Sequence, residues 1–204
     1  YTRSPSSSTI IPVAAPAPPR SETPSAREPT QAAPPPSAVS GIKKGYARVE
    51  SSNVTLGYIG NALINNEWCT VVATKSDAVV FEFLPVPGTI RFQRDQEALA
   101  VQSHYVNLNL TAGSRSFCAL FKGSEAKKST VYQWGGPRMH NLWSIADGNK
   151  ISAHWPTDEG GKWALEPVVY TVDKRLYMTV DGAAFVKGAE EEFYKRAILR
   201  WEKA

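Results

Sequence analysis

The sequence predicts an all-β domain, an antiparallel sandwich or barrel of about ten short strands, preceded by a disordered tail rich in Pro, Ser and Thr. Three observations support this prediction. Ten of the fifteen prolines lie in the first 40 residues, whereas all six tryptophans lie at residue 68 or later. Short stretches of alternating apolar and polar residues then recur along the chain. Gly, Asn, Asp and Pro separate these stretches at intervals of about ten residues, which is typical of antiparallel sandwiches and barrels.

Residues 1–42 are expected to form a disordered tether. There is no aromatic residue between Tyr1 and Tyr46, so the tail offers too little apolar area to offset the conformational entropy of ordering it. Its proline runs favour polyproline II, which makes it a semi-rigid spacer. Two sharper interpretations are an O-glycosylated stalk, if the protein is secreted, and a ligand for a proline-binding domain. Since the sequence starts at Tyr1 without a leader, we expect a processed product or a fragment.

Residues 43–204 suit a single β-rich domain, and a chain of this length buries roughly 70% of its unfolded surface. Without the three arginines and two glutamates of the tail, 20 basic and 17 acidic side chains remain. This small excess is spread without long runs, whereas nucleic-acid binding needs clustered Lys and Arg, so no nucleic acid is expected as a partner. No apolar run is long enough to cross a bilayer, and we expect no membrane span. The oligomeric state stays open.

The alternating pattern predicts the strands one by one. In residues 54–59, for example, Val54, Leu56 and Tyr58 fall on one face. The other strands predicted in this way, in chain order, cover residues 68–73, 78–83, 89–93, 104–110, 116–121 and 168–172. The glycine-containing stretches GNALINNE and WGGPR predict turns, and neither matches a phosphate-binding pattern.

Two hairpins and one helix are indicated by their turn and cap residues. Asp147-Gly148 joins two strands at 142–146 and 149–155, and Asp-Gly suits the positive backbone angles of a tight turn. Asp173-Lys174 joins 168–172 to a strand at 175–180 in the same way. Asp181 is expected to cap a short helix through GAAFVKG. The C-terminal segment 193–204 fits both a helical face and strand alternation, and we favour a closing strand.

Cys69 and Cys118 are the two cysteines, and each lies in an apolar strand. One interpretation is a disulfide between them, and the other is two buried free thiols in a reducing compartment. Neither cysteine has the CxxC spacing of a metal or redox site or a cationic neighbour in sequence. A catalytic role is therefore not expected for either.

The histidines give no sign of a metal or a cofactor. His104, His140 and His154 lie far apart and never at a ligand spacing such as HExxH, so we expect no metal site and no cofactor. The chain also lacks the GxSxG turn that presents a nucleophilic serine. Because catalytic triads need no fixed motif, an unrecognised hydrolase stays as a third hypothesis and the domain is expected not to be an enzyme.

Tryptophans next to loops give the most suggestive candidate site. Trp134 precedes Gly135-Gly136, Trp155 precedes Pro156, and Trp163 follows Gly160-Gly161-Lys162. An indole ring beside a flexible turn offers a flat apolar platform, and Asp158 could fix a hydroxyl of a sugar held there. The alternative is that these large rings lie at strand ends and fill the core.

Two sequons predict N-glycosylation in a secreted protein, one at Asn53 and one at Asn109. Both support secretion only faintly, because about one such triplet is expected by chance in a chain of this composition.

Several strings resemble a β-rich domain that recurs in mushroom-forming fungi. They are GYARVESSNVTLGYIGN, ATKSDAVVFEF and LWSIADGNKISAHWPTDEGGKWALEPVVYTVDKRLYMTVDGAAFVK, which together cover roughly residues 45–187 with a poorly matched middle at 88–130. The shared positions are mostly tryptophan, glycine and turn residues, so the resemblance implies a β fold. That family has no assigned activity, and the resemblance implies no functional residue.

These observations favour a non-catalytic binding or structural domain of a fungal protein, extracellular or associated with the cell wall, with a glycan as its ligand. The alternative is a cytoplasmic domain that binds another protein and keeps both thiols free. The state of Cys69 and Cys118 and the exposure of the loop tryptophans separate these two hypotheses.

Overall fold

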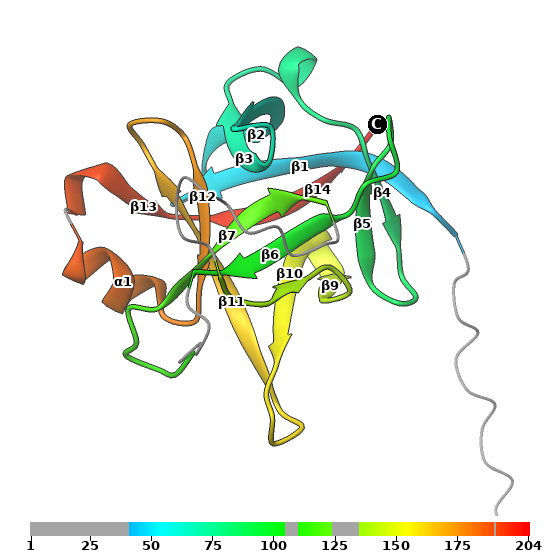
Figure 1. Ribbon diagram of the computed structural model, residues 1–204. Coiled ribbons are helices and arrows are strands. Elements are labelled where there is room, and N and C mark those ends of the chain that lie inside the picture. Colours follow the sequence, from blue (N-terminus) through cyan, green and yellow to red (C-terminus); the bar gives the residue numbers. More distant parts are fainter. Residues whose placement is uncertain (1–40, 105–109, 124–134, 190) are drawn as a thin grey trace, which may run out of the picture. The chain divides into compact units, whose positions relative to one another are not determined.

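The computed structural model describes residues 41–104, 110–123, 135–189 and 191–204, and its fourteen strands form one antiparallel sheet (Figure 1). This confirms the predicted all-β class. The strands are β1 (Lys43–Ser51), β2 (Val54–Ile64), β3 (Trp68–Val72), β4 (Phe81–Leu84), β5 (Thr89–Phe92), β6 (Leu99–Ser103), β7 (Phe117–Lys122), β8 (Arg138–Met139), β9 (Trp143–Ile145), β10 (Lys150–Pro156), β11 (Lys162–Tyr170), β12 (Leu176–Thr179), β13 (Tyr194–Arg196) and β14 (Ile198–Lys203). Short 3-10 turns lie at η1 (Lys75–Asp77), η2 (Asp147–Asn149) and η3 (Glu191–Phe193), and one α-helix, α1, covers Gly182–Gly188.

The sheet closes on itself. Strand pairing runs in the order β12, β11, β10, β14, β1, β2, β3 and β7, and β7 pairs in turn with β12. Strand β6 adds to the other edge of β7, and the β4–β5 hairpin joins the start of β1. Of the two predicted architectures, the circuit of pairings therefore matches the closed one.

Two cores lie on the two faces of this closed sheet, because successive residues of a strand point to opposite sides. The larger one, the inner core, contains residues from all eight strands of the circuit, including Cys118 and Leu120 of β7 and Leu176 and Met178 of β12. The alternate residues of these strands, such as Ala119 and Tyr177, face outward and belong to a second, outer core. Its buried residues are Trp68, Ala119, Phe121, Val168, Tyr177 and Phe185. Helix α1 covers this outer core: its Phe185 ring lies 5.9 Å from the ring of Tyr177. Figure 1 shows α1 and β13 together on this side of the sheet.

The turn and cap predictions hold. Strands β9 and β10 pair across the Asp147-Gly148 turn, with positive φ angles at Gly148 and Asn149, and Lys174 has a positive φ between β11 and β12. The carboxylate of Asp181 accepts a hydrogen bond of 2.8 Å from the amide of Ala184 at the start of α1. The C-terminal segment forms β13 and β14, so the closing strand is confirmed.

Several segments differ from the strand predictions, and β1, β8 and residues 162–167 of β11 were not predicted as strands. Residues 60–64 of GNALINNE continue β2, and the turn expected there begins only at Asn65, where two successive asparagines have positive φ angles. The strand found near the predicted 104–110 segment is β6, Leu99–Ser103, and residues 105–109 lie outside the described part of the chain. None of the helices in the described ranges has the length and apolar character needed to span a membrane.

Candidate functional site

The tryptophans predicted to form a platform have different environments. Trp155 and Trp163 are directly opposite each other in the β10–β11 hairpin, so both side chains leave the same face of the sheet. Trp155 is only 6% exposed and belongs to the inner core, which corrects its prediction as a ligand platform, whereas Trp163 is 37% exposed. Trp134 lies outside the described residues.

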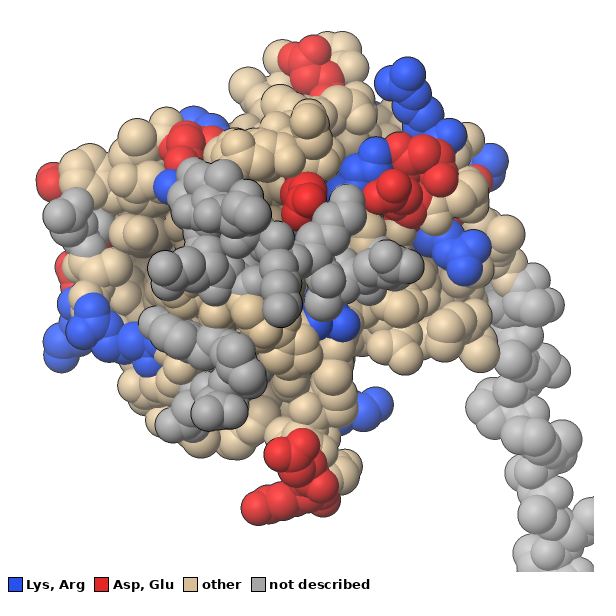
Figure 2. Space-filling model, in the orientation of Figure 1, with Lys and Arg blue, Asp and Glu red and all other residues tan. Residues whose placement is uncertain are grey.

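Of the two loop rings that the structure describes, only that of Trp163 lies at the surface. Asp158 and Glu159 are exposed at the tip of the same hairpin, and Figure 2 shows acidic side chains gathered there. The tip is closed by backbone and hydroxyl hydrogen bonds between Thr157 and Gly161. Trp163 therefore lies on a protruding hairpin, away from the hollow described below.

Cys69 and Cys118 are free and fully buried, so the interpretation as a disulfide is wrong and that of two buried free thiols holds. Both point into the inner core from β3 and β7. Burial raises the pKa of each thiol well above its usual range, although Lys122 and Arg138 lower that of Cys69 in part. Such thiols behave as small apolar side chains and not as nucleophiles.

The first sequon is accessible in the structure. Asn53 is exposed in the tight turn between β1 and β2, where Ser52 and Asn53 both have positive φ angles. The second sequon asparagine, Asn109, lies outside the described residues. Glycosylation at either position stays a prediction.

A hollow of about 640 Å³, here called the polar groove, opens at the surface where β2, β5 and β7 approach one another. Its lining residues are Asn61 and Leu63 of β2, Ala78, Val79 and Val80 before β4, Phe92 of β5, Gln93, Arg94 and Asp95 of the following turn, and Lys122 of β7. We call its apolar residues, which are buried or half-buried, the floor, and its exposed polar residues, Asn61, Gln93, Arg94 and Asp95, the rim. Its volume lies within the range of about 300–1,000 Å³ that is usual for small-ligand sites.

A bulge in β2 opens the polar groove. The register between β2 and β3 shifts between Ile59 and Leu63, and Gly60 pairs instead with Ala78. The Cβ of any other residue at position 60 would lie 2.2 Å from a methyl group of Val72, so this position needs glycine. Bulges redirect side chains, and this one places Asn61 on the rim of the groove.

The opposite rim is the turn after β5, which backbone hydrogen bonds hold in place. The amide of Gln96 donates to the carbonyl of Phe92, and the amide of Phe92 donates to Glu97. The Asp95 carboxylate accepts a hydrogen bond from the ammonium group of Lys122, which also lies 5.2 Å from the centre of the Phe92 ring. Burial raises the pKa of Asp95, but the hydrogen bonds from Lys122 and from the Glu97 amide outweigh it and leave the pKa below its usual range.

Other side chains on the rim are left without partners. Among the described residues, the side chains of Asn61, Gln93 and Arg94 make no hydrogen bond or ion pair, although Arg94 acts electrostatically on its neighbour Asp95. Sequence reasoning missed all three. An isolated glycine inside an alternating stretch, Gly60 before Asn61, is the signal that could have indicated the bulge.

The histidines do not converge on the groove. The His104 ring stacks on Phe117, with 5.2 Å between the ring centres, and burial lowers its pKa. In the described part of the chain no three His, Cys, Asp or Glu side chains gather as a metal site. The groove can therefore offer hydrogen bonds, charge and apolar contact, and its described residues offer no metal or histidine base.

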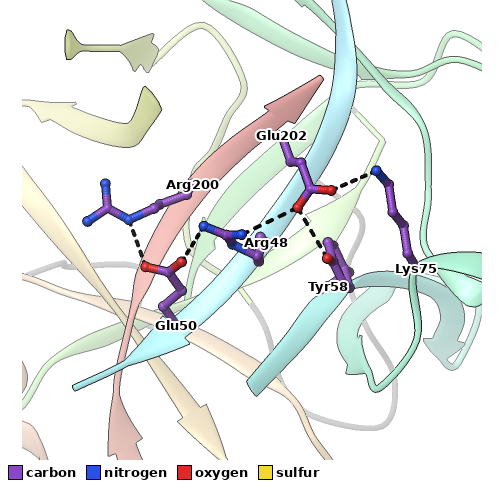
Figure 3. A network of polar contacts seen from close by, with 6 residues as sticks. All are labelled: Arg48, Glu50, Tyr58, Lys75, Arg200 and Glu202. Carbon is purple, nitrogen blue, oxygen red and sulfur yellow. Dashed lines mark hydrogen bonds and ion pairs between the residues drawn. The ribbon is translucent and has the colours of Figure 1, made fainter. Parts of the chain in front are cut away.

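A second polar cluster lies on the outer face of β1 and β14, and both of its carboxylates, those of Glu50 and Glu202, are paired (Figure 3). Glu50 accepts hydrogen bonds or ion pairs from Arg48 at 2.6 Å and from Arg200 at 2.7 Å. Glu202 binds Lys75 at 2.6 Å and the Tyr58 hydroxyl at 3.2 Å. Since these carboxylates are already shared among cations of the same chain, the cluster ties strands together and is not a candidate ligand site.

No protein-family model, curated protein or solved structure matches this chain.

Proposed function

We propose that the domain is a non-catalytic carbohydrate-binding module and that the polar groove is its binding site. One observation carries the proposal: an apolar floor lies between rim side chains, those of Asn61, Gln93 and Arg94, that have no partner among the described residues. All three side chains are exposed, so their donors and acceptors bind water until a ligand replaces it. Unpaired donors and acceptors around a hollow are what a polar ligand needs.

The chemistry of the rim matches that of a sugar. Each amide of Asn61 and Gln93 both donates and accepts hydrogen bonds, as a pair of neighbouring sugar hydroxyls does. A pyranose ring also has an apolar face, which the half-buried side chains of Leu63 and Val80 can contact in the groove. The two amides lie on different elements, β2 and the turn after β5, so they can contact a ring from two sides.

Binding is favoured over catalysis by the residue types in the groove. Its one carboxylate, Asp95, already accepts a hydrogen bond from Lys122. The residues described as lining the groove include no His, Cys, Ser, Thr or Tyr side chain. General acid–base or nucleophilic chemistry needs such a group close to a second one, and hydrolysis of a glycoside usually needs two carboxyl groups.

The biological setting follows the resemblance to the fungal domain family and the proline-rich tail. Together they support an extracellular or wall-associated role, in which the tail would act as a spacer between the module and its attachment point. A polysaccharide of the cell wall is then the natural ligand.

A glycan array tests the proposal, with wild-type protein, Asn61→Ala and Gln93→Ala as probes. Losing one hydrogen bond of about 1 kcal/mol should weaken binding about fivefold, and the double variant should bind at least tenfold more weakly. Asn141→Ala is the matched control, because Asn141 is exposed outside the groove. Retention of no glycan, or loss of binding on Trp163→Ala with Asn61→Ala unaffected, would contradict the groove as the site.

A protein-interaction domain is the second candidate function. The free thiols of Cys69 and Cys118 favour a reducing compartment, and Trp163 is exposed on a protruding hairpin where a partner could contact it. The mass of the protein, isolated from its host and alkylated without reduction, shows whether both thiols are free there. A lysate pull-down that identifies one partner, lost on Trp163→Ala and kept on Asn61→Ala, would favour this function over the first.

A further inference from the structure

The charges of the polar groove are unbalanced. Of its three charged side chains, Lys122 and Asp95 form an ion pair. Arg94 is exposed and makes no hydrogen bond or ion pair in the described part of the chain. The groove thus holds one positive charge in excess, and it belongs to a guanidinium group whose donors are all open to a ligand.

The backbone on either side of Arg94 is fixed although its side chain is unpaired. The amide of Gln93 donates to the carbonyl of Val80 at 3.0 Å, and the amide of Gln96 donates to Phe92 at 2.8 Å. The side-chain amide of Gln96 adds hydrogen bonds to Glu82 and to the carbonyl of Gln93. Arg94 therefore lies on a turn that is fixed to the sheet, so the turn loses less conformational entropy when a ligand binds.

From this arrangement we infer that the polar groove selects acidic carbohydrate, with Arg94 binding the carboxylate of a uronic acid residue. The inference rests on the proposed function and names its ligand class. A guanidinium group binds a carboxylate through two parallel N–H donors, whereas an ammonium group acts as a point charge. Lys122 is held by Asp95, so the selective contact falls to Arg94.

An acidic peptide is the competing ligand, and the groove suits it less well. Peptides that bind along a sheet add as a strand and use free backbone groups. The backbone of the floor is already paired: the amide of Val79 donates to Ile59, the amide of Ala78 donates to Lys75, and the carbonyl of Val80 accepts from Gln93. A ligand can therefore contact only side chains of the groove. The amides of Asn61 and Gln93 suit the hydroxyl groups of a sugar, and the guanidinium group of Arg94 suits a carboxylate.

The test is calorimetric titration with uronate oligosaccharides, oligogalacturonate first, each paired with its methyl ester. The ester keeps the sugar skeleton and removes the charge. A charge-assisted pair contributes about 1.5–3 kcal/mol, so the acid should bind at least tenfold more tightly than the ester. In Arg94→Gln this ratio should fall close to one while the affinity for the ester stays unchanged. Arg91→Gln is the matched control, because Arg91 lies on β5 outside the groove lining and should keep the ratio.

The outcomes separate this inference from the function on which it rests. If no glycan binds, neutral or acidic, both are overturned. If neutral glycans bind and the acid has no advantage over its ester, the uronate inference is overturned and the proposed function stands. Dextran sulfate or poly-glutamate that binds as tightly as oligogalacturonate would overturn the assignment in favour of general attraction of anions. Equal losses in Arg91→Gln and Arg94→Gln would do the same.

Discussion

Replacing Glu50 by Gln should be among the most damaging single changes on the outer face of the sheet. Arg48 and Arg200 are directly opposite each other in β1 and β14, and like charges in that position repel. Glu50 separates them, with one carboxylate oxygen bound to each arginine (Figure 3). The side chain of Glu50 is only 10% exposed, so water does not replace it easily. Glutamine keeps the shape but removes the charge, and its amide group turns donors toward an arginine.

The expected loss follows from these contacts. Two charge-assisted hydrogen bonds contribute about 1.5–3 kcal/mol each, and breaking a buried ion pair costs about 3–5 kcal/mol. Both arginines are 34% exposed and can regain water, which lowers the cost. We therefore expect Glu50→Gln to reduce the free energy of unfolding by about 2–3 kcal/mol.

Urea denaturation followed by tryptophan fluorescence measures this loss. With an m-value of about 2 kcal/mol/M, the midpoint should fall by about 1–1.5 M at unchanged m. Glu82→Gln is the matched control, because it removes the same charge from an ion pair whose lysine is mostly exposed, and it should change the midpoint little. Equal midpoints for Glu50→Gln and wild type, or an equal loss in Glu82→Gln, would refute the reasoning.

Three further predictions address the helix cap, the thiols and the bulge. Hydrogen bonds from the amides of Ala184 and Gly113 lower the pKa of Asp181 in the folded protein. The stability that this carboxylate contributes is therefore present above its unfolded pKa of about 3.9 and is lost as the pH falls through its folded pKa. Below pH ~4 the free energy of unfolding should drop more steeply in wild type than in Asp181→Asn. Iodoacetamide should leave native Cys69 and Cys118 unmodified and add two groups to unreduced protein in urea, whereas no adduct in urea would show a disulfide. Gly60→Ala should lower the free energy of unfolding, measured by urea denaturation, by about 1–3 kcal/mol, because the new Cβ clashes with Val72. Adding Val72→Ala should restore part of the lost stability. If Gly60→Ala is as stable as wild type, the steric explanation is wrong.

The fold was largely predictable because the signals that define it are local. Alternation indicated most strands, Asp147-Gly148 and Asp173-Lys174 indicated hairpins, and Asp181 indicated the helix start. Closure of the sheet was not predictable, because the pairing of β7 with β12 joins segments that lie more than 50 residues apart. The outer core was missed for a related reason: fully buried strands such as β7 have apolar residues on both faces, and alternation does not show which face meets α1.

The candidate site was predicted poorly, and the reason lies in the tryptophans. The local sequence around a tryptophan beside a turn is the same whether its ring is exposed, like that of Trp163, or buried, like that of Trp155. The burial of the ring depends on which distant segments pack against it. The polar groove joins Asn61, Arg94 and Lys122 from three distant segments, so no local motif carries it. The glycine inside the β2 pattern is a usable signal in the sequence, although the stretch around it predicts a turn and not a bulge.

The most direct test of sugar binding in the polar groove is an NMR titration of the protein with oligogalacturonate and its methyl ester. The side-chain amide signals of Asn61 and Gln93 should shift with both ligands, and the Arg94 guanidinium signal should shift with the acid alone. The indole signal of Trp163 should stay unchanged. Shifts confined to Trp163 and the β10–β11 hairpin, or no shift on the groove at saturating ligand, would contradict sugar binding in the groove.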